Sequence, residues 1–443
     1  MLNQHNHYTD LKYHRKHTIL RNITVVIITL GLIGTTPTAT FGKETKPPKP
    51  DTIVVRLDSA SDSTVNSINA EYDTMTEQVI TGIPGAYVLR TRDGRDAKKA
   101  AEKMRKDRRV LFAEEDMLTG AIDANPIGIG AWGEPTMPEY IGQDAVSLLG
   151  LPQAQAIARG ADTTVAVLDT GVQLDHPGLV ANLVQGYDFV DDDAVPQDVA
   201  DGRDDNGNGR VDEVYGHGTH IAGIIHLVAP DAKIMPLRVL DADGRGSVIS
   251  LALAIAYAIQ NGATVINVSL GTDTDSALLR AMIDDATKHG ILVVASAGNL
   301  DSDSPQYPAA DACALGVTSI NAADARSPFS SFGKWVDFSA PGEAIYSTFP
   351  TNAYAHWSGT SMATPFVAGQ IALIRSAAPQ LSIRDVVKAM QNSAVSIDKL
   401  KTNKHEKGRL GIGRIDIGTS VQMAASGRVD QSGPKKLKGG CLN

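Results

Sequence analysis

Three residues of this chain could cooperate in nucleophilic catalysis, although they lie far apart in the sequence. Asp169 follows an apolar run, His217 lies between two glycines in the stretch Gly216–His220, and Ser361 lies in the stretch Ser358–Pro365. A serine hydroxyl is a weak nucleophile until a base takes its proton, and an imidazole with a pKa near about 6.5 can do so at neutral pH. A carboxylate on the second ring nitrogen fixes the tautomer and stabilises the imidazolium. We therefore expect these three residues to form a catalytic triad.

Each of these residues also has an ordinary structural explanation. An aspartate after a strand is commonly a turn residue or a helix cap, and a serine at a helix start is commonly an N-cap. His217 and His220 could be paired metal ligands, but no glutamate of the His-Glu-x-x-His kind accompanies them. Asn299, which follows the apolar run Ile291–Ala295, could be an ordinary turn residue. The triad therefore depends on the residues occurring together rather than on any one of them.

The segment from about Leu151 onward alternates strand and helix patterns. Short apolar runs predict strands that are buried on both faces of a sheet, and longer runs that end at glycine predict helices. The predicted strands are Thr163–Leu168, Lys233–Val239, Thr264–Val268 and Ile291–Ala295, and the predicted helices are Ser247–Gln260 and Ser276–His289. This alternation indicates a parallel sheet with helices on both faces. Ligands of such sheets bind at the carboxyl ends of the strands, and Asp169 and Asn299 follow two of these ends.

Five stretches, in this order, are similar to the motifs of the subtilisin-like serine protease family. They are Val167–Gly171, His217–Gly223, Asn267–Gly271, Ser296–Asn299 and Ser358–Gly369. The chain order Asp, His, Ser is the one known for that family. The resemblance covers about Asp51 to Ala425, and it implies an α/β, subtilisin-like three-layer fold with a mostly parallel central sheet, preceded by a small α+β propeptide. It also implies a secreted serine endopeptidase that acts through an acyl-enzyme intermediate and activates itself by propeptide cleavage.

The resemblance also implies roles for further residues. The backbone N–H of Ser361 and the side-chain amide of Asn299 would hold the oxyanion of the reaction. Two segments that line the edges of the substrate cleft would bind an extended peptide by main-chain hydrogen bonds. The residues implied for substrate binding are Gly244 and Gly246 on one edge, Ser269, Leu270 and Gly271 on the other, and Ser296, Ala297 and Gly298 before the oxyanion amide. The substrate side chain preferred before the scissile bond stays open. Many relatives have a small residue at the base of the specificity pocket, before a Tyr-Pro pair, and here Gln306 precedes Tyr307-Pro308.

Two other classes of protein were weighed against this prediction. A catalytically silent binding protein with the same fold would not need Asp169, His217, Asn299 and Ser361 together. A nucleotide-binding enzyme would need a Gly-x-Gly-x-x-Gly or a Gly-x4-Gly-Lys-Ser/Thr motif directly after a strand, and neither motif follows any of the predicted strands. The protease prediction is therefore favoured.

The first 42 residues have the pattern of a secretory signal. Lys12, Arg15, Lys16 and Arg21 precede the apolar run Ile23–Gly34, which is shorter than the about 20 residues that span a bilayer. Export with cleavage is therefore preferred to a membrane anchor. The expected organisation is a signal peptide at 1–42, a linker at 43–50, an inhibitory and chaperoning propeptide at 51–120, a catalytic domain at 121–426 and a flexible tail at 427–443. Asn125 would lie near the mature N-terminus.

The charge and cysteine content limit the partners. The chain of 443 residues has 41 Lys and Arg and 50 Asp and Glu, a net charge of −9. The first 50 residues contribute 7 − 2 = +5, so the remainder carries 34 − 48 = −14, which argues against nucleic acid. Cys313 and Cys441 are too few for a disulfide scaffold or a four-cysteine zinc site, and whether they pair is open. The expected partners are polypeptide substrates and the chain's own propeptide, with a monomeric enzyme.

An acidic stretch before His217 predicts a structural calcium site. Residues 188–213 contain ten acids and two arginines, and such crowding repels itself unless it is solvated or bound to a cation. Within this stretch the spacing Asp-x-Asn-x-Asn-Gly resembles an EF-hand loop, although its twelfth position is not Glu. The candidate ligands are Asp204, Asn206, Asn208, Asp212 and Glu213. The alternative is a solvated acidic turn. A second calcium loop of many relatives is expected to be missing, because little sequence separates His226 from Lys233.

Overall fold

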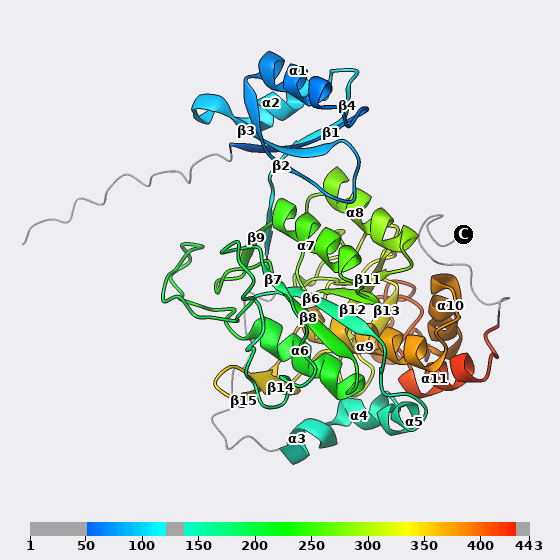
Figure 1. The fold of residues 1–443 in the computed structure, drawn as a ribbon. Coiled ribbons are helices and arrows are strands. Elements are labelled where there is room, and N and C mark those ends of the chain that lie inside the picture. The colour runs from blue at the N-terminus through cyan, green and yellow to red at the C-terminus, as the bar shows by residue number, and fades with distance from the viewer. Residues whose placement is uncertain (1–50, 121–136, 431–443) are drawn as a thin grey trace, which may run out of the picture. The chain divides into compact units, whose positions relative to one another are not determined.

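The computed structural model of the protein describes residues 51–120 and 137–430, which are coloured in Figure 1. The predicted signal peptide and linker lie outside this part, as do Asn125, Cys441 and most of the predicted tail. Within the described ranges no helix is long and apolar enough to cross a membrane.

The N-terminal described segment is a small α+β domain. Its four strands form an antiparallel sheet in the order β2-β3-β1-β4, and Ile53, Leu89 and Met104 lie in the core between this sheet and two helices. The elements are β1 (Thr52–Leu57), α1 (Asp62–Tyr72), β2 (Thr74–Val79), β3 (Ala86–Thr91), α2 (Ala97–Met104) and β4 (Val110–Glu115). The α+β class expected for this segment is confirmed.

The larger segment is built on a seven-stranded sheet in the order β13-β12-β11-β10-β6-β8-β7, and its neighbouring strands are paired in parallel. The strands are β6 (Thr164–Asp169), β7 (Tyr187–Asp188), β8 (Lys233–Arg238), β10 (Val265–Val268), β11 (Leu292–Ser296), β12 (Ala314–Ile320) and β13 (Phe338–Pro341). The four predicted strands are therefore confirmed to within about a residue at their ends, together with the α/β class. The strands β7, β12 and β13 were not predicted from the sequence.

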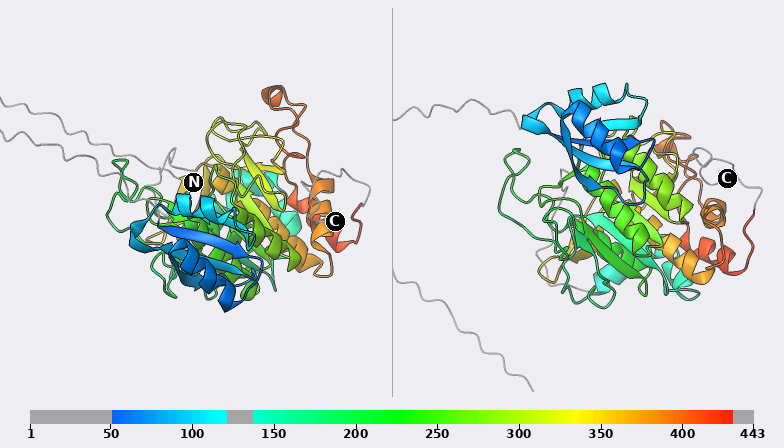
Figure 2. Two further views of the ribbon diagram at one scale, coloured as in Figure 1. Left: turned by 90° about the horizontal axis from the view of Figure 1, so that it is seen from above. Right: turned by 45° about the horizontal axis from the view of Figure 1, so that its top comes forward.

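Two hydrophobic cores cover the two faces of this sheet. Successive residues of β6 alternate between them, because the side chains of a strand point to opposite faces: Val165 and Val167 belong to one core, and Ala166 and Leu168 to the other. The first core contains α6 (His217–Val228) and α9 (Thr360–Ala377), and the second contains α7 (Val248–Gln260) and α8 (Ala277–Lys288). Figure 1 and the turned views in Figure 2 show the strands between these helices.

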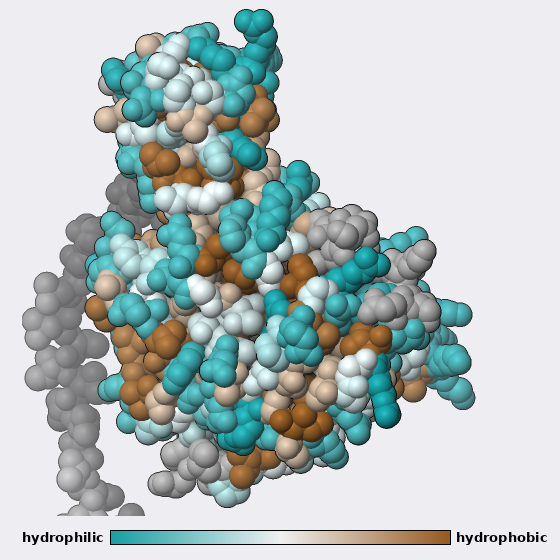
Figure 3. All heavy atoms as spheres, turned by 45° about the vertical axis from the view of Figure 1, so that its right-hand side comes forward, coloured by the Kyte–Doolittle hydropathy of each residue, from teal (hydrophilic) through white to brown (hydrophobic). Residues whose placement is uncertain are grey.

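Shorter elements complete the larger segment. The first core is extended by α3 (Met137–Gly142), α4 (Asp144–Leu148), α5 (Leu151–Gln155), α10 (Ile383–Ser393) and α11 (Ile417–Ala425). A hairpin of β14 (Ile345–Phe349) and β15 (Ala353–Trp357) precedes α9, and a short antiparallel pair joins β5 (Leu118–Gly120) to β9 (Arg245–Ser247). On the face shown in Figure 3, apolar side chains are dispersed in small groups among hydrophilic ones.

The helices α6 and α9 approach each other closely because glycine replaces larger residues at their contact. A Cβ atom added at Gly369 of α9 would lie 2.6 Å from Cβ of Val228 in α6. A Cβ added at Gly223 of α6 would lie 2.2 Å from Oγ of Ser347 in β14. These separations are shorter than van der Waals contact, so α6 has little freedom to move relative to α9 and the hairpin.

We expect Gly369→Ala to destabilise the protein by about 1–3 kcal/mol, because the overpacking outweighs the helix propensity that alanine adds. Calorimetry should show a melting temperature lowered by several degrees. Gly142→Ala is the matched control, since an added Cβ meets nothing within 4 Å at that helical position. Equal melting temperatures for Gly369→Ala and the unmodified protein would contradict the close contact.

Candidate active site

His217 and Asp169 form a hydrogen-bonded pair in the interior of the protein. Asp169 is the last residue of β6, His217 is the first residue of α6, and His217 Nδ1 lies 2.7 Å from Asp169 Oδ1. Both side chains are fully buried. Because a carboxylate can only accept a hydrogen bond, Nδ1 carries a proton and Nε2 is the ring nitrogen that can act as a base. The backbone N–H of Thr170 donates to the same carboxylate oxygen at 2.8 Å.

The glycines on either side of His217 are required by the packing. A Cβ at Gly218 would lie 2.1 Å from the Gly171 carbonyl oxygen, and 3.1 Å from Asp169 Cβ. Gly216 has a φ of +88°, which disfavours other residues. The ring of His217 meets the edge of Trp357, with the ring centroids 5.2 Å apart. Strand, glycine and indole together fix the orientation of the imidazole.

Ser361 lies in the first turn of α9, where its side chain is buried. Its Oγ donates to the Ser269 carbonyl at 3.0 Å, and Ser269 Oγ donates back to the Ser361 carbonyl at 3.0 Å. Ser269 follows β10, so these two bonds connect the start of α9 to the carboxyl end of a central strand. The chain thus brings Asp169, His217 and Ser361 to the same edge of the sheet.

The amide of Asn299 is held in one orientation. Its Oδ1 accepts a hydrogen bond from the Thr360 backbone N–H at 2.9 Å, and the Gly298 N–H donates to Thr360 Oγ1 at 2.9 Å. Because Oδ1 of Asn299 accepts this hydrogen bond, the NH₂ group is the donor end of the amide. Thr360 was not predicted as a site residue, because nothing in the sequence distinguished it apart from its place before Ser361.

His220 is a structural histidine. Its Nε2 lies 3.0 Å from the Ala355 carbonyl and 3.1 Å from the Ile345 carbonyl, and burial lowers its pKa to about 3. Within residues 51–120 and 137–430, no group of three or more His, Cys, Asp or Glu side chains is arranged to hold a metal ion. The alternative of a metal site on His217 and His220 therefore has no support in the geometry.

The two edges implied for substrate binding flank the segment that ends the N-terminal domain. In the pairing of β5 with β9, Thr119 lies opposite Gly246 and Gly120 opposite Arg245. On the other side, Gly120 N donates to the Gly271 carbonyl at 3.1 Å, and Gly271 N donates to the Gly120 carbonyl at 3.0 Å. The strand Leu118–Gly120 therefore lies between both edges.

The remaining residues implied for substrate binding differ in what they can contribute. Gly244 has a φ of +76° in the turn before β9. Leu270 is buried in the second core, so only its backbone faces the edge. Ser296 and Ala297 are buried at the end of β11, before Gly298 and the amide of Asn299. Gln306 is also buried.

The acidic loop before α6 is organised by its own side chains. Asn206 Nδ2 and Asn208 Nδ2 donate to Glu213 Oε1 at 2.8 and 2.5 Å, and the Glu213 side chain is only 4% exposed. Asp204 accepts from the backbone of Asn208 at 3.0 Å and of the following glycine at 2.8 Å. Asp212 instead accepts from the backbone of residues 201 and 202. The side chains of Asn206, Asn208 and Glu213 therefore meet, Asp204 binds the backbone of the same loop, and Asp212 is engaged elsewhere.

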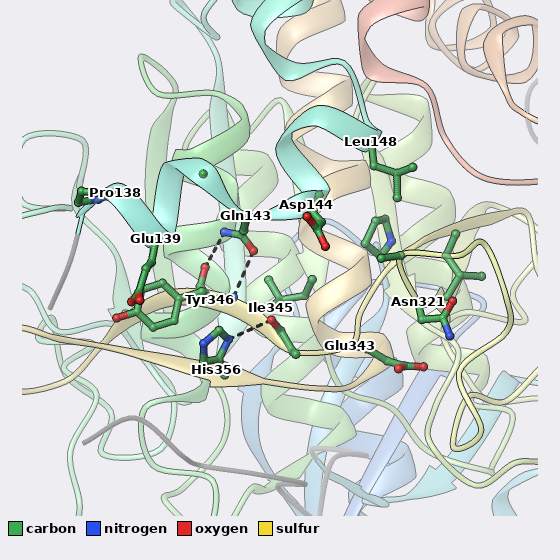
Figure 4. A pocket seen from close by; sticks show the side chains of 16 residues that line it. Pro138, Glu139, Gln143, Asp144, Leu148, Asn321, Glu343, Ile345, Tyr346 and His356 are labelled. Atoms are coloured by element: carbon green, nitrogen blue, oxygen red, sulfur yellow. Dashed lines mark hydrogen bonds between the residues drawn. The ribbon is translucent and has the colours of Figure 1, made fainter. Parts of the chain in front are cut away.

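A cavity of about 720 Å³ lies apart from these residues, and Figure 4 shows it. It is lined by residues of α3, α4, β14 and β15 together with two loops, and Asp169, His217, Asn299 and Ser361 are not among them. Gln143 bridges its wall, accepting from Tyr346 N at 3.2 Å and donating to the Tyr346 carbonyl at 2.8 Å. The catalytic candidates therefore do not line this cavity.

Comparisons with known proteins agree with this geometry. Residues 160–413 match the model of the subtilase family, and residues 34–116 match the model of the fervidolysin N-terminal prodomain. The chain is 43% identical to thermitase of Thermoactinomyces vulgaris over 256 residues, which are 56% of this chain and 86% of thermitase. It is 40% identical to subtilisin BL of Lederbergia lenta over 260 residues, which are 56% of this chain and 88% of that protein.

A solved structure is also similar in fold. It is fervidolysin from Fervidobacterium pennivorans, described as a keratinolytic enzyme related to subtilisin, with a TM-score of 0.67 and 24% sequence identity. The match covers 84% of this chain and 61% of fervidolysin, so this chain spans less than two thirds of that protein.

Proposed function

Because this chain belongs to the subtilase family and is a serine protease with an N-terminal prodomain, we propose that Asp169, His217 and Ser361 are its catalytic triad. The observation that carries this assignment is the buried 2.7 Å contact between His217 Nδ1 and Asp169 Oδ1. It leaves Nε2 of the same ring as the base for Ser361.

Each member of the triad has one task in hydrolysis. Ser361 Oγ attacks the peptide carbonyl while His217 Nε2 takes its proton, and that proton then passes to the leaving amine. The acyl-enzyme is hydrolysed by water, which gives its proton to the same nitrogen and releases Ser361. Asp169 keeps the proton of Nδ1 in place and stabilises the imidazolium of each step. Its burial strengthens this interaction, because no water competes for the carboxylate.

The oxyanion of the tetrahedral intermediate would be held by Asn299 and by the backbone N–H of Ser361. Support comes from the bond between Thr360 N and Asn299 Oδ1, which fixes the amide beside the residue that precedes Ser361. A donor that is fixed before the reaction needs no reorganisation when charge develops. In this family, loss of such an amide is known to cost about 10²–10³ in kcat.

We also propose that the N-terminal domain is an intramolecular inhibitor. Its strand β5 forms with β9 and Gly271 the main-chain hydrogen bonds that an extended substrate would form. Two acids of the same domain meet helix N-termini. Glu114 accepts from Ala277 N at 3.0 Å at the start of α8, and Asp116 accepts from Ile249 N at 3.3 Å at the start of α7. Negative charge is favourable at helix N-termini, and burial raises the pKa of Asp116 to about 6.

The same pairing indicates which bond is cut during self-processing. In an antiparallel register the paired residue numbers have a constant sum, and Gly120 is paired with Gly271. Continued by two residues, this register would set position 122 opposite Ser269, whose carbonyl accepts from Ser361 Oγ. We therefore expect the first cut to follow Ile122, beyond the part of the chain that the structure describes.

Calcium is proposed as a structural ligand of the acidic loop. Asp204, Asn206, Asn208 and Glu213 offer oxygen atoms, which calcium prefers. One observation supports a cation: Glu213 Oε2 is buried and accepts no hydrogen bond in the structure, and Arg210 Nη1 is 3.6 Å away. A bound cation would neutralise the converging acids and order the loop that leads to His217.

Loss of Ser361 or of His217 should abolish hydrolysis. Ser361→Ala and His217→Ala should each lower kcat by about 10⁶, the magnitude known in this family, and the double variant should be little worse because the triad acts as a unit. Turnover of a peptide substrate measures this, and fluorophosphonate labelling of Ser361 counts active sites. Residual activity of about a tenth in Ser361→Ala would disprove the assignment.

Self-processing and export are tested on the full chain. The mature enzyme should appear outside the cell with Asp123 at its N-terminus, and Ser361→Ala should accumulate as a precursor. Inserting one glycine after Gly120 should move the cut to follow Ala121, because the register and not the local sequence determines it. N-terminal sequencing of the first product measures both positions. A cut that still follows Ile122 in the insertion variant would refute the register, and normal trimming of Ser361→Ala in a protease-free host would refute self-processing.

Removal of calcium should lower the melting temperature of the mature enzyme, because binding to the folded state stabilises it by mass action. Asp204→Ala should be less stable and should lose its sensitivity to chelator, whereas Asp231→Asn, an exposed acid paired with Arg159, should keep it. Calorimetry with millimolar calcium or with chelator makes the comparison. Identical melting temperatures of the unmodified enzyme in both solutions would exclude a stabilising calcium site.

A further inference from the structure

Asp198 is a buried carboxylate at the start of the helix that carries His217. Its Oδ1 accepts from Gly216 N at 3.1 Å, and its Oδ2 accepts from Thr219 N at 3.2 Å and from Thr219 Oγ1 at 2.6 Å. Asp198 is 2% exposed. It lies in the loop before α6 and follows Gln197, so it is remote from the helix in sequence although it caps its first turn.

Asp198 accepts hydrogen bonds from residues on both sides of His217 in the sequence. Gly216 and Thr219 flank the histidine, so the carboxylate holds the backbone on both sides of the residue whose ring is held by Asp169. The turn is held a second time by the segment after Asp169, because Gly218 N donates to Thr170 Oγ1 at 2.9 Å. His217 is therefore positioned by two carboxylates, Asp169 through the ring and Asp198 through the backbone.

The hydroxyl of Thr219 links Asp198 to the loop that follows Asp169. Its Oγ1 donates to Asp198 and accepts from Gln173 N at 3.0 Å, and Gln173 lies in the loop that follows Asp169. A shift of Asp198 would therefore move the turn of α6 and the loop after β6 together. Because the reacting atoms must be aligned closely, a displacement of about 1 Å in such a unit costs about 10²-fold in rate.

The charge of Asp198 has no cationic partner among the described residues. Asp169 is the titratable side chain that acts on it, and Tyr215 lies within reach of its charge. Burial and the charge of Asp169 raise the pKa of Asp198, whereas the hydrogen bonds that it accepts from Thr219 and Gly216 favour its charged form. An uncompensated carboxylate beside the catalytic pair favours a positive charge there, and the positive charge that arises in the reaction is the imidazolium of His217.

We propose that Asp198 is a positioning residue of the protease, which orients His217 through the first turn of α6 and whose negative charge stabilises the imidazolium. This inference rests on the proposed role of His217 as the base. The two fail differently: if His217 is not the base, His217→Ala stays active, whereas failure of the role of Asp198 leaves His217→Ala inactive.

Asp198→Asn keeps the size and one acceptor oxygen but removes the charge. We expect kcat to fall by about tenfold or more with KM within about twofold, because ground-state contacts to the substrate are unchanged. The acid limb of kcat/KM should move to lower pH by a few tenths of a unit or more, since loss of a nearby negative charge disfavours the imidazolium. A residue with only a structural role would not move this limb. Active sites are counted with a fluorophosphonate before each comparison.

The matched control is Asp231→Asn, a carboxylate beyond the other end of α6 that pairs with Arg159 at 2.9 Å. It should leave kcat and the acid limb unchanged. If Asp198→Asn does not fold, Thr219→Val and Thr219→Ser replace it: valine removes the hydroxyl that Asp198 accepts from and should lower kcat several-fold, and serine should restore it. Unchanged kcat in Asp198→Asn, a lowered kcat with an unmoved acid limb, or equal kcat in the two Thr219 variants would each overturn the proposal.

Discussion

The hydrogen bond between His217 Nδ1 and Asp169 Oδ1 is the interaction on which the rest of the site depends. Removing a carboxylate from water is costly unless hydrogen bonds replace the lost hydration. Oδ1 of Asp169 accepts from the ring of His217 and from the backbone N–H of Thr170, whereas the buried Oδ2 accepts no hydrogen bond in the structure, so the carboxylate depends on these two donors. A side chain at Gly218 would separate the pair, since its Cβ would collide with the chain after β6. The closeness of two buried groups therefore determines the local sequence on both sides of the histidine.

The parallel sheet supplies the edge at which these groups meet. β6, β10 and β11 end side by side. Asp169 is the last residue of β6, and Ser269 and Asn299 lie in the segments that follow β10 and β11. On the first face, α6 and α9 both begin at this edge, so His217 and Ser361 are each in a first helical turn. The contact at Gly369 then keeps the two helices, and with them the base and the nucleophile, in a fixed relation.

Much of this could be predicted from the sequence, for physical reasons. Strands buried on both faces are short apolar runs, and helices that cover them begin at serines whose side chains cap them, as Ser247 and Ser276 do in the structure. By contrast, β12 was missed because its buried Thr318 and Ser319 look polar. Thr318 bonds to Ser330 and Ser319 to Ser327, and both serines lie in the loop that follows β12.

The candidate site shows the same division. Residues that react were evident from their type and spacing, whereas residues that orient them were not. Asp198 is one of ten acids in residues 188–213 and could not be told from its solvated neighbours until its burial was known. Thr360 acts partly through its backbone N–H, which every residue other than proline has. Asp212, a candidate calcium ligand, instead accepts a hydrogen bond from the backbone of residue 201, and its place in the sequence did not reveal this partner.

The strand Leu118–Gly120 pairs with the cleft through its backbone; the side chain of Thr119 is buried there, whereas Leu118 is 69% exposed. Main-chain hydrogen bonds carry little specificity of their own, so the fraction of clefts that is occupied depends on the concentration of the strand near the cleft. While both belong to one chain, the effective local concentration is about millimolar whatever the amount of protein present. Once the chain is cut beyond Gly120, the same contacts become an equilibrium between two molecules. Dilution then separates them, so the amount of free protease would follow the volume into which the protein is released.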